Sequence, residues 1–141
     1  MSVNDNKAIV RKAVEEIWQK HNLSVLEQVY DKRYVYHGAP STKTELRGPE
    51  GYRQMVEMEL KAFPDASISA DEIVAEGETV VMRWTFRGTH KGDYNGVAPT
   101  GRQNANPGVS IFHFASGKIM DEWAMWDERR SYQLLGVAAP L

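Results

Sequence analysis

Apolar residues near the start of the chain recur with the period of an α-helix. From about residue 5 to residue 20 they form two adjacent rows at four-residue spacing: Ile9, Ala13 and Ile17, and Val10, Val14 and Trp18. A second, short helix is expected from Ser24, which has Glu27 at the spacing of a capping box. A third helix opens at Gly48-Pro49 and stops at Pro64.

The period changes from helical to two after Pro64, which indicates strands. Strands are expected over residues 33–38, 67–75, 79–88, 103–114 and 118–127, and a short last helix over residues 128–135. Pro107 interrupts one of these strands and indicates an edge or a bulge. A polar loop covers residues 39–47. Helices followed by a run of strands predict an α+β fold, with N-terminal helices packed on a curved, mostly antiparallel β-sheet. Such a sheet can enclose a cone-shaped pocket.

Composition narrows the range of functions. The 141 residues fit one domain over residues 1–141, and a net charge of −2 gives no general attraction to nucleic acid or membrane. The absence of cysteine excludes disulfides and thiolate metal sites. No apolar run is long enough to span a bilayer, and the N-terminus lacks the apolar core of a signal peptide. The four histidines have no metal-site spacing, and no phosphate-binding motif is present. We therefore expect a soluble, cytoplasmic protein without a metal site.

The block from Val80 to Asp127 carries a family resemblance. It contains Val-Met-Arg-Trp-Thr-Phe-Arg-Gly-Thr-His, then Gly-Val-Ala-Pro-Thr-Gly-Arg, then Ile-Phe-His-Phe-Ala-Ser-Gly-Lys-Ile-Met-Asp-Glu-Trp. This block resembles the SnoaL-like polyketide cyclases of the NTF2-like superfamily. The resemblance implies a cone-shaped α+β fold, a homodimer and a mostly apolar cavity. It also implies an intramolecular aldol ring closure of a hydrophobic polyketide ester without metal or cofactor.

The resemblance assigns the general acid/base role to an acidic residue near the end of the last strand, which by motif position is Asp127. An aldol closure needs a proton removed beside a carbonyl and a proton delivered to the ketone under attack. One carboxyl group can do both if an apolar pocket raises its pKa. Trp123, Met125 and Trp126 precede Asp127 and are able to form such a pocket. Asp127 is equally suited to cap the last helix, and the two roles are compatible.

The face on which His113 lies depends on the hairpin at Ser116-Gly117. A two-residue loop pairs Phe114 with Ile119, whereas a three-residue loop pairs His113 with Ile119 and places His113 beside Trp123 and Asp127. Glycine at the third loop position favours the second register. His113 is then a second catalytic candidate, and an exposed histidine is the alternative.

Further residues are candidates for substrate contact. His37 precedes a loop that the resemblance places at the cavity mouth. Arg83 is suited either to an ion pair with Asp121 or Glu122 or to anchoring a substrate carbonyl. An apolar wall is expected from Trp18, Tyr52, Met55 and Trp123, for which ordinary core packing is the alternative. Trp84 faces the core or a dimer interface.

Three functions remain open at this point. The first is the aldol cyclase. The second is another enzyme on the same scaffold, an isomerase, dehydratase or epoxide hydrolase, because one fold supports many chemistries. Hydration chemistry is favoured if His37, His113 and Asp127 share one wall. The third is a non-catalytic, dimeric module that binds small molecules, for which Asp127 is exposed and the cavity is filled by its own side chains.

Overall fold

The computed structural model describes residues 2–38 and 45–139. The helical elements are α1 (Val3–Ala13), η1 (Val14–Gln19), η2 (Leu23–Val25), α2 (Leu26–Val29), α3 (Gly48–Ala62) and α4 (Glu128–Leu134). The strands are β1 (Tyr30–His37), β2 (Leu46–Arg47), β3 (Ser67–Glu76), β4 (Thr79–Thr89), β5 (Gln103–Ala115) and β6 (Lys118–Trp126). This order confirms the expected α+β fold.

The strands form one sheet in the order β2-β1-β6-β5-β4-β3. Strands β3 to β6 make the expected antiparallel meander, and β1 pairs with β6 in parallel. Strand β2 was not expected. It has two residues and lies inside the predicted polar loop over residues 39–47, and so short a segment shows no strand period. Residues 39–44 of that loop lie outside the described part of the chain.

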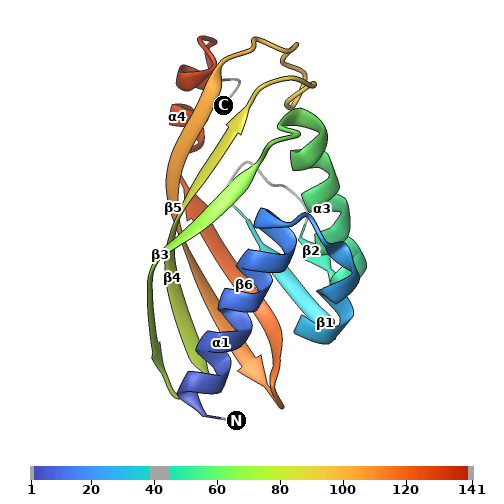
Figure 1. Cartoon of the computed structure of the whole chain (residues 1–141), viewed down its shortest axis with the longest axis vertical. Helices are drawn as coiled ribbons and strands as arrows, with labels where there is room; N and C mark the ends of the chain where they lie inside the picture. Colours follow the sequence, from blue (N-terminus) through green and yellow to red (C-terminus); the bar gives the residue numbers. More distant parts are fainter. Residues whose placement is uncertain (1, 39–44, 140–141) are drawn as a thin grey trace.

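The sheet is strongly twisted, and the longer helices lie against one of its faces (Figure 1). Helix α1 contacts β3 and β4, α3 contacts β1, and α4 contacts β5. The inward-facing residues of β4 alternate along the strand as expected, and Val80, Met82, Trp84 and Phe86 are buried beneath the helices. The hydrophobic core therefore occupies the space between the helices and the concave face of the sheet.

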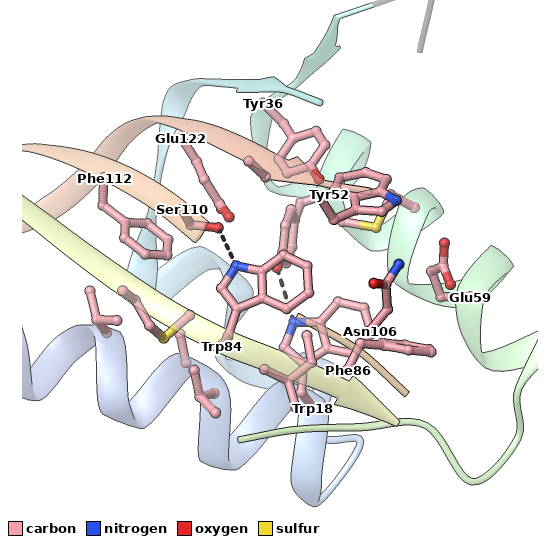
Figure 2. Close-up of a pocket in the computed structure, with 18 of the residues that line it drawn as sticks. Trp18, Tyr36, Tyr52, Glu59, Trp84, Phe86, Asn106, Ser110, Phe112 and Glu122 are labelled. Carbon is pink, nitrogen blue, oxygen red and sulfur yellow. Dashed lines mark hydrogen bonds between the residues drawn. The ribbon is translucent and has the colours of Figure 1, made fainter. Parts of the chain in front are cut away.

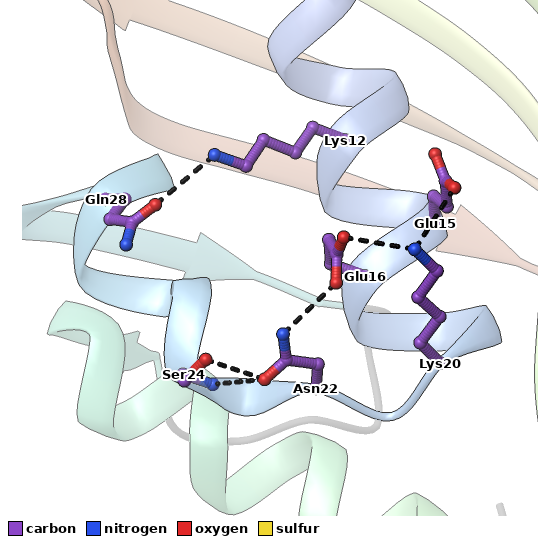
Figure 3. A network of polar contacts seen from close by, with 7 residues as sticks. All are labelled: Lys12, Glu15, Glu16, Lys20, Asn22, Ser24 and Gln28. Carbon is purple, nitrogen blue, oxygen red and sulfur yellow. Dashed lines mark hydrogen bonds and ion pairs between the residues drawn. The ribbon is translucent and has the colours of Figure 1, made fainter.

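The first helix is not uniform, although its apolar rows predict one regular helix. After Ala13 it continues as a π-helix, η1, in which the amide of Lys20 donates to the carbonyl of Glu15. On the solvent side Glu16 accepts hydrogen bonds from Lys20 and from Asn22, which ties η1 to the following turn (Figure 3). π-Helical turns occur frequently at functional sites. This one carries Trp18, which lines the cavity described below.

The hairpin between β5 and β6 has the two-residue loop, so the three-residue loop favoured from the sequence, with His113 opposite Ile119, is wrong. The strand pair also contains a bulge that the sequence does not predict. Phe114 pairs with Ile119 across Ser116-Gly117, but the next pair is His113 with Asp121, so Met120 has no partner in β5. A one-residue shift moves every later side chain to the opposite face. The bulge therefore turns Glu122 inward, whereas an unbulged strand places it outside.

The first five residues of β5, which include Pro107, form an edge of the sheet, as the proline predicts, although the rest of β5 lies between two strands. Strand β6 ends at Trp126, which pairs with Gly108, and Pro107 pairs with Thr85 of β4. Residues 103–107 of β5 therefore have a strand neighbour on one side only, so a missing N–H group is tolerated there. Over the described residues, the helices are all too short or too polar to cross a membrane.

Candidate active site

A mainly apolar cavity lies between the helices and the inner face of the sheet, and Figure 2 shows side chains that line it. Its volume is about 90 Å³. That volume is small for a multi-ring molecule, but the flexible side chains of Met55 and Met82 line the cavity and are able to adjust to a ligand. Besides these, the lining includes Trp18, Tyr30, Tyr36, Tyr52, Glu59, Ile68, Trp84, Phe86, Tyr94, Asn104, Asn106, Ser110, Phe112, Glu122, Trp126 and Ser131.

Glu122 is the acidic group of this cavity with the least contact with solvent. Its relative exposure is 5%, and its carboxylate Oε1 accepts a hydrogen bond from the Tyr34 hydroxyl at 3.0 Å. Burial raises the pKa of Glu122 to about 7, although hydrogen bonds from Tyr34 and Ser110 act in the opposite direction. A carboxyl group with this pKa is populated in both protonation states near neutral pH, as a proton carrier requires.

A cluster of tyrosines surrounds the end of the cavity that holds Glu122, which we call the inner end. The rings of Tyr30 and Tyr52 have centroids 4.7 Å apart, and the Tyr52 hydroxyl accepts a hydrogen bond from Trp18 Nε1 at 3.1 Å. Burial raises the pKa of Tyr52, and a hydrogen bond with Tyr30 lowers it in part. Because the Tyr52 oxygen accepts from Trp18, its own proton remains available to donate. Tyr52 is thus a neutral hydrogen-bond donor beside Glu122.

Trp84 occupies the middle of the cavity wall. Its indole Nε1 donates to Ser110 Oγ at 3.0 Å, and its ring covers Gly108 so closely that a Cβ atom there lies 2.3 Å from Trp84 Cζ2. Glycine is therefore required at position 108 for this ring position. Trp84 was expected in the core or in a dimer interface, and the structure places it in the core, facing the cavity.

The other end of the cavity is polar. Figure 2 shows Glu122 and Ser110 on one side of the Trp84 ring and Asn106 and Glu59 on the other. Glu59 comes from α3 and is partly buried, and this burial raises the pKa of Glu59 to about 7. Asn106 is buried in β5, where its Nδ2 donates to the carbonyl oxygen of Asp127 and to Ser131 Oγ, both at 2.8 Å. The cavity thus holds a carboxyl group near each end.

The structure brings three of the predicted substrate-binding residues together. Trp18, Tyr52 and Met55 all line the cavity. They come from η1 and α3, whose apolar faces are visible in the sequence as helical periodicity. The hydrogen bond between Trp18 and Tyr52 is a further link between these two elements.

Asp127 lies outside the cavity, at the start of α4. It is exposed, and its carboxylate caps the helix by accepting from the amide of Arg130 at 3.0 Å. The helix-capping role proposed from the sequence is therefore present. Within residues 2–38 and 45–139, no apolar pocket surrounds the carboxylate, because the bulge at Met120 sends Trp123 and Met125 to the outer face of the sheet.

The remaining candidates also lie on the outer side of the sheet. His113 Nδ1 is 2.6 Å from Asp121 Oδ1, and Trp123 is 50% exposed and stacks on His37 with ring centroids 3.9 Å apart. His37 Nδ1 also lies 3.1 Å from Glu45 Oε2. The wall of His37, His113 and Asp127 that would favour hydration chemistry is therefore not part of the cavity.

Arg83 does not form the ion pair that was expected from the sequence. It is exposed and pairs with Asp71 and Glu72 of the neighbouring strand β3, and not with Asp121 or Glu122. The alternation of β4 fixes this outcome, since Arg83 lies between the inward-facing Met82 and Trp84.

Sequence reasoning missed Glu122 as a central site residue because its face depends on the bulge. The available signal was a pair of adjacent acidic residues, Asp121 and Glu122, in a strand that also carries two tryptophans, and this pattern does not by itself identify which carboxyl group is buried. Among the described residues, no three histidine or carboxylate side chains come together as metal ligands.

Comparison with known proteins agrees with this architecture. Residues 8–134 match the model of the SnoaL-like polyketide cyclase family. Aklanonic acid methyl ester cyclase AcmA of Streptomyces galilaeus is 30% identical over 131 residues, which cover 91% of each chain. A solved protein of Acidithiobacillus ferrooxidans, described as a proposed polyketide cyclase, is 29% identical with a TM-score of 0.83, over 99% of this chain and 100% of that chain.

A second solved protein, AclR of Streptomyces galilaeus, is described as a proposed hydroxylase. It is 28% identical with a TM-score of 0.82, over 96% of this chain and 83% of that chain. The expected NTF2-like fold is confirmed by these structures, and the expectation of a cyclase-type enzyme agrees with the named relatives. The chain belongs to the SnoaL-like polyketide cyclase family.

Proposed function

We propose that this protein closes a ring in a polyketide-type β-keto ester by an intramolecular aldol reaction, with Glu122 as the group that carries the proton. The observation that supports this most strongly is a buried carboxyl group with a pKa of about 7 that faces an apolar cavity. The names of the curated relatives, which are aklanonic acid methyl ester cyclases, support an aromatic polyketide ester as the substrate class.

The reaction starts with Glu122 as a carboxylate. It removes a proton from a carbon between two carbonyl groups, and the electron pair of the broken C–H bond is held as an enolate. The enolate carbon attacks a ketone carbon of the same molecule, which forms the new C–C bond. The ketone oxygen becomes an alkoxide and takes the proton back from the Glu122 carboxyl, which restores the carboxylate. The reaction therefore needs no external oxidant or reductant.

Tyr52 is suited to stabilise the enolate. Its hydroxyl accepts from Trp18 Nε1, so its own proton is not used in that hydrogen bond, and its raised pKa keeps it protonated. A neutral donor aimed at a developing negative charge stabilises that charge more strongly in a dry site than in water. The apolar walls, including Phe86 and Phe112, exclude the water that otherwise competes.

The test is deuterium uptake from D₂O at the α-carbon of a panel of 1,3-dicarbonyl compounds, followed by NMR. We expect uptake above the buffer rate with the wild type, and its loss in Glu122→Gln. Glutamine keeps an acceptor oxygen for the Tyr34 hydroxyl, so the fold is maintained.

Asp127→Asn is the matched variant for the role that the family resemblance assigns to Asp127. If Glu122 carries the proton, this variant retains uptake. Loss of uptake in Asp127→Asn, with Glu122→Gln active and both variants folded, refutes the assignment to Glu122. Absence of uptake from every compound with the wild type favours a binding module.

A further inference from the structure

Asn106 presents an unpaired carbonyl oxygen in the cavity wall. The orientation of its amide is fixed, because Nδ2 donates to the carbonyl oxygen of Asp127 and to Ser131 Oγ, and a carbonyl oxygen accepts only from a donor. The Oδ1 atom on the other side of the amide is buried and has no hydrogen-bond partner among the described residues. Buried polar atoms in folded proteins are nearly always paired. This oxygen is therefore free to accept from a ligand.

Asn104 has a second unpaired side-chain oxygen, one inward-facing position away on β5. It is 3% exposed and Asn106 is 2% exposed, both line the cavity, and Asn104 Oδ1 also has no partner among the described residues. Side chains two residues apart on a strand point to the same face. Two buried acceptors thus lie along one wall of the cavity.

These acceptors lie far from the end at which Glu122 acts. Asn106 and Ser110 are both inward-facing residues of β5, and at roughly 3.3 Å per residue they are about 13 Å apart along the strand. Ser110 belongs to the inner end, where it hydrogen-bonds Glu122. A ligand that reaches both ends is therefore about 13 Å long, which is longer than a single six-membered ring.

We propose that Asn104 and Asn106 bind hydroxyl groups of an elongated, polycyclic substrate, at the end remote from the carbon at which Glu122 removes a proton. This inference rests on the proposed function for the position of the reacting carbon. The unpaired atoms are acceptors, so they require a donor on the ligand. The carboxyl group of Glu59 lines the same part of the cavity and opposes an anionic group there. A hydroxyl group satisfies both conditions, whereas a carboxylate or a ketone does not.

The experiment compares two ligands that differ only in this hydroxyl group. 6-Hydroxy-2-acetylnaphthalene and 2-acetylnaphthalene have the same ring system and the same methyl ketone, and equilibrium dialysis at mildly acidic pH, where the hydroxyl group is protonated, gives the Kd of each. We expect the wild type to bind the hydroxyl compound about tenfold or more tightly, because a site built around an acceptor rejects a ligand without the donor.

Asn104→Leu and Asn106→Leu remove the acceptors and keep the number and branching of the side-chain heavy atoms. Each is expected to reduce the preference to about threefold or less, with the Kd of 2-acetylnaphthalene little changed. Asn106 also anchors α4, so Asn106→Leu is the variant more exposed to misfolding. If it does not fold, the result for Asn104→Leu alone tests the inference. Asn6→Leu is the matched control, because Asn6 is a buried asparagine with an unpaired Oδ1 that does not line the cavity.

A wild-type preference near one, as expected if the two oxygens only hold water, overturns the inference, and so does a preference that survives in the folded leucine variants. Glu122→Gln is expected to keep the preference. Failure of the proposed function is therefore seen separately, as deuterium uptake that persists in Glu122→Gln while the hydroxyl preference remains.

Discussion

The Tyr34 hydroxyl donates a hydrogen bond to Glu122 Oε1 over 3.0 Å, and both side chains are buried at the inner end of the cavity. Burial and this hydrogen bond act on the carboxyl group in opposite directions. Burial raises the pKa of Glu122, and the donated hydrogen bond stabilises the carboxylate and lowers it. The pKa of about 7 is the balance of the two effects.

Tyr34→Phe removes the hydrogen bond and leaves the burial. We expect the pKa of Glu122 to rise further above 7, because the hydrogen bond from Tyr34 lowers it in the wild type. NMR titration of the ¹³C-labelled carboxyl group measures this value directly. Tyr132→Phe is the control, since the Tyr132 hydroxyl accepts from Asn95 and makes no contact with Glu122. An unchanged or lowered pKa in Tyr34→Phe contradicts this account.

The raised pKa of Glu122 also links stability to pH. The folded protein binds this proton up to a pH of about 7, whereas the unfolded chain releases it near 4.5. Native Glu122 therefore holds more protons than unfolded Glu122 between these values, and its contribution to the free energy of unfolding falls as pH rises through that window. From roughly 1.4 kcal/mol per pKa unit, the change is about 3 kcal/mol.

Glu122→Gln lacks this titration. Subtracting its free energy of unfolding from that of the wild type at each pH cancels the groups that both proteins share. The difference is expected to decline between pH 4.5 and 7 and to level off above 7. Denaturant unfolding at several pH values gives both curves. A difference that increases with pH rules out a raised pKa.

Gly108→Ala is expected to displace the Trp84 ring, because the added Cβ lies 2.3 Å from Trp84 Cζ2. Overpacking of this kind costs about 1–3 kcal/mol of stability. The hydrogen bond from Trp84 to Ser110 is also lost when the ring moves. Thermal unfolding and near-ultraviolet circular dichroism measure the two effects. Val109→Ala, on the outer face of the same strand, serves as the control, and an effect of the same size there contradicts the argument.

The outer face of the sheet is the surface that we propose for pairing with a second copy of the chain. Trp123 is 50% exposed and Met125 is 66% exposed, on a face that also presents Val109 and Ile111. Large exposed apolar patches mark interaction sites. We expect a dimer by light scattering, and a monomer for Trp123→Glu combined with Met125→Glu. Met58→Glu replaces an equally exposed methionine on α3 and is expected to remain dimeric. A monomeric wild type contradicts the proposal.

The sequence identified most of the fold, because helical and strand periods are local properties. The alternation of β4 placed Trp84 and Arg83 on opposite faces correctly, although the ion-pair partners proposed for Arg83 were wrong. The hairpin at Ser116-Gly117 was foreseen, but the bulge at Met120 was not. That single residue exchanges the faces of Glu122 and Trp123, because strand faces alternate residue by residue. The position of β6 was therefore predicted correctly, whereas the carboxyl group that it turns into the cavity was not.

The pH dependence of α-proton exchange tests the role of Glu122 most directly. With a 1,3-dicarbonyl compound, the exchange rate of the wild type is expected to rise with pH through a midpoint of about 7, because the carboxylate is the active form. Asp127→Asn is expected to keep this profile, and Glu122→Gln to lose it. A midpoint near the ordinary glutamate value of 4.5, or a profile abolished by Asp127→Asn and retained in Glu122→Gln, contradicts the central claim.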